Sequence, residues 1–119
     1  MNQNSKPLYQ VKHIKAGDGA TFAKTGEKAN VHYTGTLPHN GKKFDSCKDR
    51  NTPFSFTLKI KVIQCWDEVV SIMTKGEIIY VICPAKLAYG EKGAGGIIPP
   101  NADIAFEIEA LYFREKDKI

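Results

Sequence analysis

The segment Val62–Met73, which reads VIQCWDEVVSIM, carries a helical pattern in a chain that is otherwise mostly strand-like. Apolar residues recur in it at intervals of three and four, the spacing of one helix face. They are Val62, Trp66, Val69, Val70 and Met73. Asp67 and Glu68 suit an early helical turn because acidic side chains there complement the helix dipole, and Gly76 is placed to end the helix. A short helix that must bury a tryptophan needs a second layer of structure to cover it.

Most of the remaining chain is typical of β-strands. Between Lys28 and Leu37, apolar and polar residues alternate with the period of two that indicates a half-buried strand. Asn40-Gly41 predicts a tight hairpin turn, because both positions of that turn favour a positive φ. Further strands are expected over Leu8–Ile14, Pro53–Leu58, Glu77–Cys83 and Ile104–Ala110. The pattern predicts an α+β fold in which one antiparallel sheet is wrapped on one helix.

Length and composition predict a single domain. We expect residues 1–7 of the 119 to form a flexible tail and residues 8–119 to form the domain. The chain is 42% hydrophobic and 25% charged, which argues against disorder. No apolar run approaches the roughly 20 residues of a membrane span, and the polar start lacks the apolar core of a signal peptide. The net charge of +4 is scattered rather than clustered, which argues against a nucleic-acid partner.

The cysteines give a hypothesis about the cellular compartment. There are three, Cys47, Cys65 and Cys83, and an odd number cannot all pair within one chain. Their spacing fits no zinc pattern, and no Asn-x-Ser/Thr glycosylation site occurs. We therefore expect each cysteine to be a small buried hydrophobic residue, and we expect the protein in a reducing compartment, the cytoplasm or the nucleus.

Signatures of covalent, nucleotide-dependent and metal-dependent catalysis are absent from the sequence. No phosphate-binding loop, zinc-protease helix or nucleophile elbow occurs. The histidines, His13, His32 and His39, are far apart along the chain. The chain instead carries aromatic residues near its turns and an apolar Ile97-Ile98 pair in a loop, where polar residues are the rule. An apolar loop beside aromatic side chains predicts a hydrophobic binding pocket, with no metal and no cofactor.

Six segments give the sequence a family resemblance. They are Val31-His-Tyr-Thr-Gly35, Gly41-Lys-Lys-Phe-Asp-Ser46, Asp49-Arg-Asn-x-Pro-Phe54, Val62-Ile-x-x-Trp66, Leu87-Ala-Tyr-Gly90 and Gly96-Ile-Ile-Pro-Pro100. Each is weak alone, but together they occur in order between about Val11 and Leu111. The chain resembles the FKBP family, the tacrolimus- and rapamycin-binding peptidyl-prolyl cis-trans isomerases. The resemblance implies a curved antiparallel sheet of about five strands wrapped around one short α-helix.

The resemblance also implies an apolar pocket with Trp66 as its floor. Its aromatic walls would be Tyr33, Phe44 and Phe106, and its rim would be Phe54, Val62, Ile63 and Ile97. The Tyr89 hydroxyl and the Ile63 N–H would bind ligand carbonyls. Asp45 would lie near the reacting amide, oriented by Tyr33 and Arg50. Ile98 fits the motif as a ligand contact or packs behind the pocket.

In this family the activity is rotation about X–Pro bonds, and it needs no cofactor and no metal. The partners implied are proline-containing peptide segments and macrolides of the tacrolimus and rapamycin type, with no membrane and with the protein as a monomer. An alternative is a regulatory module that holds a partner protein in the same pocket, with incidental isomerase activity. A single-strand-binding domain is less well supported, because the only two arginines are Arg50 and Arg114.

Several positions depart from the family pattern. Lys61 stands where many members carry an acid, Cys65 stands where the best-known members have glycine, and Ala94-Gly95 replaces a bulkier pair. None of these changes removes a pocket wall, so we expect ligand binding with altered affinity. The strand Glu77–Cys83 is also unusual, because its non-core face would carry Ile78, Tyr80 and Ile82. Either neighbouring side chains or the N-terminal tail cover this strip, or it is a weak contact surface.

Overall fold

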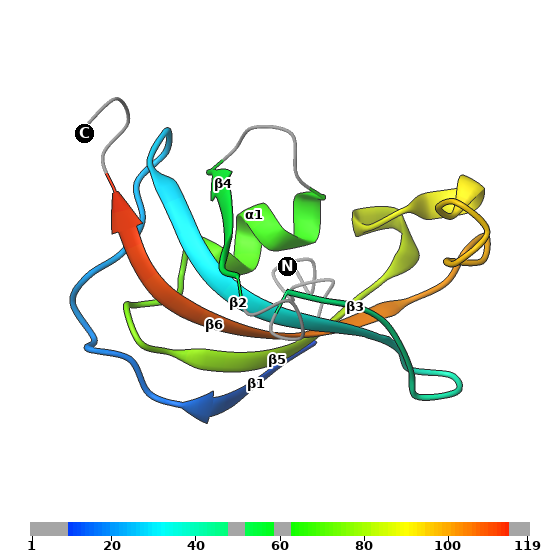
Figure 1. Ribbon diagram of the computed structural model, residues 1–119, viewed down its shortest axis with the longest axis horizontal. Coiled ribbons are helices and arrows are strands. Elements are labelled where there is room, and N and C mark those ends of the chain that lie inside the picture. The colour runs from blue at the N-terminus through cyan, green and yellow to red at the C-terminus, as the bar shows by residue number, and fades with distance from the viewer. Residues whose placement is uncertain (1–9, 48–51, 59–62, 115–119) are drawn as a thin grey trace, which may run out of the picture.

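The computed structural model describes residues 10–47, 52–58 and 63–114, and these form one antiparallel sheet with one helix in its hollow (Figure 1). The elements are β1 (Gln10–Lys15), β2 (Lys28–Leu37), β3 (Lys42–Ser46), β4 (Phe54–Thr57), α1 (Gln64–Val70), β5 (Ile78–Cys83) and β6 (Ile104–Arg114). Two short 3-10 turns, η2 (Ala85–Leu87) and η3 (Gly90–Lys92), lie between β5 and β6. The predicted α+β class is confirmed, with six strands rather than about five.

The sheet is organised around β2. Its strand order is β1-β5-β6-β2-β3, and β4 pairs with the other end of β2. Gly35 on β2 lies opposite both Asp45 on β3 and Phe106 on β6, while Val31 lies opposite Phe54 on β4. This register gathers side chains that are far apart in the sequence onto the concave side of the sheet, where α1 also lies.

The helix is shorter than the sequence predicts. α1 ends at Val70 rather than near Gly76, and Val62 lies outside the described residues. After Val69 the chain tightens, because Ile72 and Met73 donate to carbonyls three residues back and the Ser71 hydroxyl donates to Glu68 O at 2.7 Å. Met73 is nevertheless buried, so the apolar spacing marked the core-facing side correctly although the helix stops earlier.

Strand boundaries differ from the prediction by a few residues at each end. Residues 8 and 9 of the first predicted strand lie outside the described residues, and the described part is β1. β4 is shorter than Pro53–Leu58, whereas β6 continues past Ala110 to Arg114. That extension pairs with the start of β2 through a register shift between Asn30 and Val31, which a repeating pattern in one strand cannot reveal.

The core fills the space between the concave face and α1. Its fully buried members include Val31, Ile79, Val81, Ile104 and Ile108 from the sheet and Val69 and Val70 from the helix. The alternation predicted for β5 is confirmed, since Ile79, Val81 and Cys83 are buried whereas Ile78, Tyr80 and Ile82 are half-buried on the other face. The N-terminal tail proposed to cover that face lies outside the described residues.

Two of the three cysteines are paired. Cys65 in α1 and Cys83 at the end of β5 form a disulfide, with their Cα atoms 5.9 Å apart, and Cys47 is a buried free thiol. All three are buried as expected, but the expectation that each is unpaired is wrong for Cys65 and Cys83. Two equal spacings of 18 residues do not reveal which pair the fold brings together.

Candidate functional site

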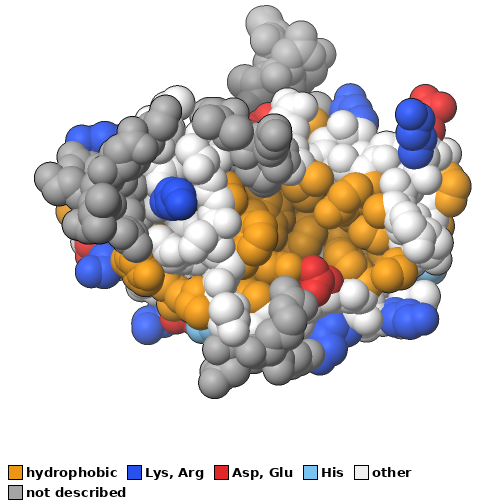
Figure 2. All heavy atoms as spheres, turned by 45° about the horizontal axis from the view of Figure 1, so that its top comes forward, with side chains coloured by type: hydrophobic (Ala, Val, Ile, Leu, Met, Phe, Trp, Pro, Cys, Tyr) orange, Lys and Arg blue, Asp and Glu red, His pale blue; other side chains and the backbone are white. Residues whose placement is uncertain are grey.

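A cavity of about 480 Å³ opens on the concave side of the sheet. Figure 2 shows it as a hollow in which hydrophobic side chains gather. Its lining residues come from four strands, the start of α1 and the segment after β5. They are Tyr33, Phe44, Asp45, Phe54, Ile63, Trp66, Tyr89 and Phe106. The volume lies within the usual range for small-ligand pockets, and a lining that is mostly aromatic suits an apolar ligand group.

Trp66 lies at the bottom of this cavity with only 4% of its surface exposed. Four aromatic rings surround it, with centroid distances of 5.1 Å to Tyr33, 5.3 Å to Phe106, 5.5 Å to Phe56 and 5.8 Å to Phe54. All four pairs are edge to face, the arrangement that ring quadrupoles favour; three are close to perpendicular and the Phe56 pair is inclined at 63°. The buried indole N–H has no hydrogen-bond partner among the described residues. The floor is therefore fixed by ring packing rather than by polar contacts.

The walls come together because β2 carries a glycine beneath them. Phe44 and Phe106 meet edge to face with their centroids 6.0 Å apart. A Cβ atom on Gly35 would lie 2.6 Å from Phe44 Cζ and 3.0 Å from Phe106 Cε1. Gly35 thus makes room for both rings, a role that was not predicted from the sequence. The available signal was a glycine inside a strand pattern, which often marks a close approach.

Polar groups are few and lie at the edge of the cavity. The Tyr33 hydroxyl donates to Asp45 Oδ2 at 2.5 Å, which holds the carboxylate at the cavity wall. Tyr89 is 37% exposed and reaches the cavity from the segment between η2 and η3. Burial, reinforced by the negative charge of Asp45, raises the pKa of Tyr89 above its usual value of 10.0. The Tyr89 hydroxyl therefore keeps its proton at neutral pH and can donate a hydrogen bond.

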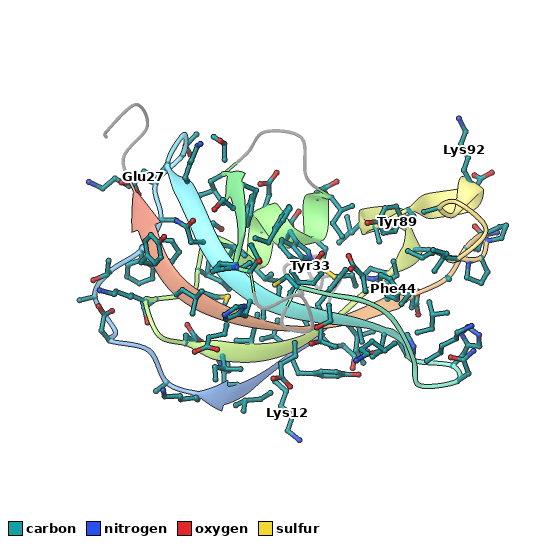
Figure 3. The ribbon with its side chains drawn as sticks, viewed as in Figure 1. Lys12, Glu27, Tyr33, Phe44, Tyr89 and Lys92 are labelled. Carbon is teal, nitrogen blue, oxygen red and sulfur yellow. A yellow bond between two sulfur atoms is a disulfide. The ribbon has the colours of Figure 1, made fainter. Side chains whose placement is uncertain are left out.

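The view with side chains shows these groups coming from separate elements. Tyr33, Phe44 and Tyr89 come from β2, β3 and the segment after β5, whereas Lys12 points away from the opposite face of the sheet (Figure 3). Ile63 supplies the start of α1, and its carbonyl accepts hydrogen bonds from the N–H groups of Trp66 and Asp67. No described residue accepts from the Ile63 N–H.

The structure does not bring every predicted residue to the cavity. Ile97 was expected at the rim, but it is 59% exposed and does not line the cavity. The turn Ala94–Ile98 explains this, because Ile97 and Ile98 both donate to Ala94 O and only Ile98 turns inward. Ile98 is 5% exposed and packs in the core behind the cavity, the second of the two alternatives for it. Arg50 and Val62 lie outside the described residues.

Within the described ranges, no cluster of three His, Cys, Asp or Glu side chains could hold a metal ion. No helix in the same part of the chain is long and apolar enough to cross a membrane.

Comparison with known proteins decides the family. Residues 19–111 match the family described as FKBP-type peptidyl-prolyl cis-trans isomerase. The chain belongs to this family. It is a peptidyl-prolyl cis-trans isomerase, in agreement with the family that the six sequence segments indicate. The match covers the whole cavity, since its lining residues run from Tyr33 to Phe106.

Individual relatives are similar over most of this FKBP-type chain. Peptidyl-prolyl cis-trans isomerase Fkbp12 of Drosophila melanogaster is 50% identical over 86% of this chain and 94% of its own length. FK506-binding protein 1 of Saccharomyces cerevisiae is 44% identical, with 86% and 90% covered. The crystal structure of FkpA from Escherichia coli superposes with a TM-score of 0.82 at 36% identity. That likeness covers 90% of this chain and 48% of FkpA.

Proposed function

We propose that this isomerase acts by holding the X–Pro amide in its twisted form within the cavity floored by Trp66. The observation that carries the proposal is the convergence of six aromatic side chains and one carboxylate on a single cavity. The aromatic set is Tyr33, Phe44, Phe54, Trp66, Tyr89 and Phe106. A prolyl ring is apolar and compact, and the cavity volume of about 480 Å³ leaves room for it and for the flanking peptide.

The physical basis is the electronic change during rotation. An X–Pro amide rotates slowly because its C–N bond has partial double-bond character, with a barrier of about 18–20 kcal/mol. The twisted state has lost that resonance and much of its charge separation, so water stabilises it less than the planar ground state. An apolar aromatic site reverses this preference and binds the twisted form better, which is what catalysis requires. No nucleophile and no proton transfer are needed.

Two donors position the peptide in this proposal. The Tyr89 hydroxyl stays protonated because burial raises its pKa, and it can donate to a substrate carbonyl. The Ile63 N–H has no acceptor among the described residues and lies at the cavity edge, so it can receive a second carbonyl. Asp45, held by Tyr33, keeps the Phe44 wall and the β2–β3 pair in register instead of moving a proton.

We further propose that tacrolimus and rapamycin compete with peptides for this cavity. FK506, which is tacrolimus, appears in the names of relatives that share 44–45% of their residues with this chain. The eight lining residues offer mostly apolar surface, which suits an apolar ligand, and the Tyr89 hydroxyl and the Ile63 N–H could bind its two carbonyl groups.

We also propose that residues 8–119 act as one domain and as a monomer. A cytoplasmic or nuclear location stays a prediction. Unpaired cysteines no longer support it, because Cys65 and Cys83 form a disulfide.

The test compares two exposed phenylalanines. Phe54 lines the cavity and is 39% exposed, while Phe22 is 48% exposed and lies elsewhere. We expect Phe54→Ala to lower the acceleration of a proline-limited refolding reaction about tenfold, because the cavity loses a wall. Phe22→Ala should leave it unchanged. Equal activity of the two variants would contradict the proposed site.

Trp66→Ala provides a second test in the same refolding assay. It removes the floor, so we expect a larger loss of activity than in Phe54→Ala. Circular dichroism and urea unfolding check that the variant still folds. A folded Trp66→Ala variant with wild-type activity would also contradict the proposal.

A further inference from the structure

The Cys65–Cys83 disulfide joins two segments that each supply residues to the proposed pocket. Cys65 precedes Trp66 in α1, and Cys83 is the last residue of β5. Both side chains are fully buried, so the bond crosses the core between the helix and the sheet. No residue of the pocket is part of the bond, yet both of its ends adjoin segments that carry the pocket.

The helix that carries the pocket floor has few local features that stabilise it. α1 spans seven residues, its N-cap Ile63 makes no side-chain cap, and its last turn has no basic residue. A helix of this length is not stable in isolation, so its position depends on tertiary packing and on covalent attachment. Among the described residues, the disulfide is the one covalent link between α1 and the sheet other than the chain itself.

Both ends of the disulfide lead to groups of the pocket. On the helix side, Cys65 lies between Ile63 and Trp66, which supply a backbone donor and the floor. On the strand side, the chain runs from Cys83 through η2 to Tyr89, which supplies the hydroxyl donor. The bond therefore fixes the spacing of two segments that must bind the same ligand.

We propose that the Cys65–Cys83 disulfide is a positioning element for this pocket and that it makes substrate affinity depend on thiol redox state. The proposal rests on the proposed function, because it assumes that Ile63, Trp66 and Tyr89 bind the ligand. The oxidised form holds the pocket in its binding geometry. In the reduced form α1 loses its covalent link to β5, and two separate buried thiols must be accommodated in place of the bonded pair. In a close-packed core that accommodation displaces α1.

The redox step is an exchange with an external dithiol. Two electrons pass from the dithiol to the Cys65–Cys83 bond, and the two thiol protons of the dithiol end on the released cysteine sulfurs. The dithiol closes into a cyclic disulfide. Because both cysteines are buried, attack requires opening of the helix. A ligand that binds the oxidised pocket more tightly must, by linkage, shift the redox equilibrium towards the disulfide by the same factor.

The experiment measures both sides of this linkage on the full chain. Wild-type protein is equilibrated in buffers of oxidised and reduced dithiothreitol, with and without saturating rapamycin, and its thiols are counted by mass spectrometry. The KM and kcat for an X–Pro peptide are measured for each form. We expect reduction to raise KM about fivefold or more, the lower end of common coupling between sites, with a smaller change in kcat. Rapamycin should favour the disulfide by a factor equal to the ratio of its affinities for the two forms.

Matched variants separate the effect of reducing the Cys65–Cys83 disulfide from any other effect of dithiothreitol on the protein. Cys47→Ala removes the free buried thiol and should keep the dependence of KM on dithiothreitol. Cys65→Ala combined with Cys83→Val fills the space without thiols and should show a KM that does not respond to dithiothreitol. An equal KM in the oxidised and reduced wild type, together with no effect of rapamycin on the redox equilibrium, would overturn the proposal.

A failure of the proposed function gives a different result. If oxidised wild-type protein binds neither rapamycin nor the peptide, the pocket assignment fails, and amide exchange in α1 then tests the positioning role by itself. Emission of Trp66, the only tryptophan in the sequence, reports on the same helix. Faster exchange and altered emission after reduction support the positioning role, and identical exchange in the two forms overturns it.

Discussion

Tyr33 connects three parts of the proposed catalytic site through one residue. Its backbone N–H lies 3.1 Å from Cys47 Sγ, and its carbonyl accepts from the Cys47 N–H at 3.2 Å. Its hydroxyl donates to Asp45, and its ring packs on Trp66. These contacts join β2 to the end of β3 and to the pocket floor. The position of the carboxylate and the position of the floor are therefore set together.

We expect loss of the Tyr89 hydroxyl to weaken ligand binding modestly and specifically. Tyr89→Phe removes one hydrogen bond to the ligand and should weaken rapamycin binding by about 0.5–1.5 kcal/mol, the net value of such a bond. Isothermal titration calorimetry measures the change. Tyr112→Phe is the matched control, because Tyr112 is similarly exposed and lies outside the cavity. A loss of equal size in both variants would argue against a hydrogen bond from Tyr89.

Gly35→Ala tests whether the walls depend on the glycine beneath them. The added Cβ atom would lie within 3.0 Å of both Phe44 and Phe106, and the half-buried Phe44 ring is the one that can move. We expect kcat/KM to fall on the order of tenfold, since misplacement by about 1 Å can cost a hundredfold. Thr36→Ala, on the other face of β2, is the control. Full activity in Gly35→Ala would show that the walls tolerate displacement.

The pH dependence of activity follows from the charge state of Tyr89. The pKa of Tyr89 is raised, so its protonated, hydrogen-bond-donating form persists to higher pH than a free phenol does. The proton is lost only as the pH rises through this raised pKa. Since rotation of the amide transfers no proton, activity should be flat from about pH 6 to pH 8. A bell-shaped profile centred near neutrality would contradict this account.

Among the elements, β5 shows a strict alternation of side chains between the core and the outer face of the sheet. Ile79 is 1% exposed and packs in the core, while Ile78 is half-buried on the convex face, where it lies opposite Glu109 of β6. The outer strip of Ile78, Tyr80 and Ile82 is thus bordered by charged residues of neighbouring strands, among them Lys12 and Glu107. Its half-burial favours the explanation that neighbouring side chains cover it.

The two faces of β5 should respond differently to truncation. We expect Ile79→Ala to lower the free energy of unfolding by about 2–5 kcal/mol, the usual cost of a cavity in a packed core. Ile78→Ala should cost much less, because its site is already partly open to water. Urea unfolding of the two variants provides the comparison. Equal losses would mean that both faces of the strand are buried.

At the scale of the whole molecule, the fold was predictable because its signals are local and repeated. The period of two in β2 and the helical spacing around Trp66 each follow from burial of one face. The eight residues that line the cavity were all named from the sequence, because seven of them lie in contiguous family motifs and the resemblance as a whole adds Phe106. Local patterns and motif order therefore carried both the architecture and most of the site.

What could not be predicted depends on contacts between distant segments. Pairing of Cys65 with Cys83 requires knowing that the start of α1 faces the end of β5. The outward turn of Ile97 depends on hydrogen bonds within its loop, and the space beneath Phe44 depends on the register of β2 with β3 and β6. None of these leaves a pattern in the sequence of one segment.

In the proposed function, one aromatic cavity both binds the macrolide and catalyses the rotation. Exchange between the cis and trans forms of an X–Pro peptide can be followed by NMR while rapamycin is added in steps. We expect catalysed exchange to fall linearly and to vanish when one equivalent of rapamycin has been added, while peptide contacts at Trp66 disappear in parallel. Catalysed exchange that continues in protein saturated with rapamycin would contradict it.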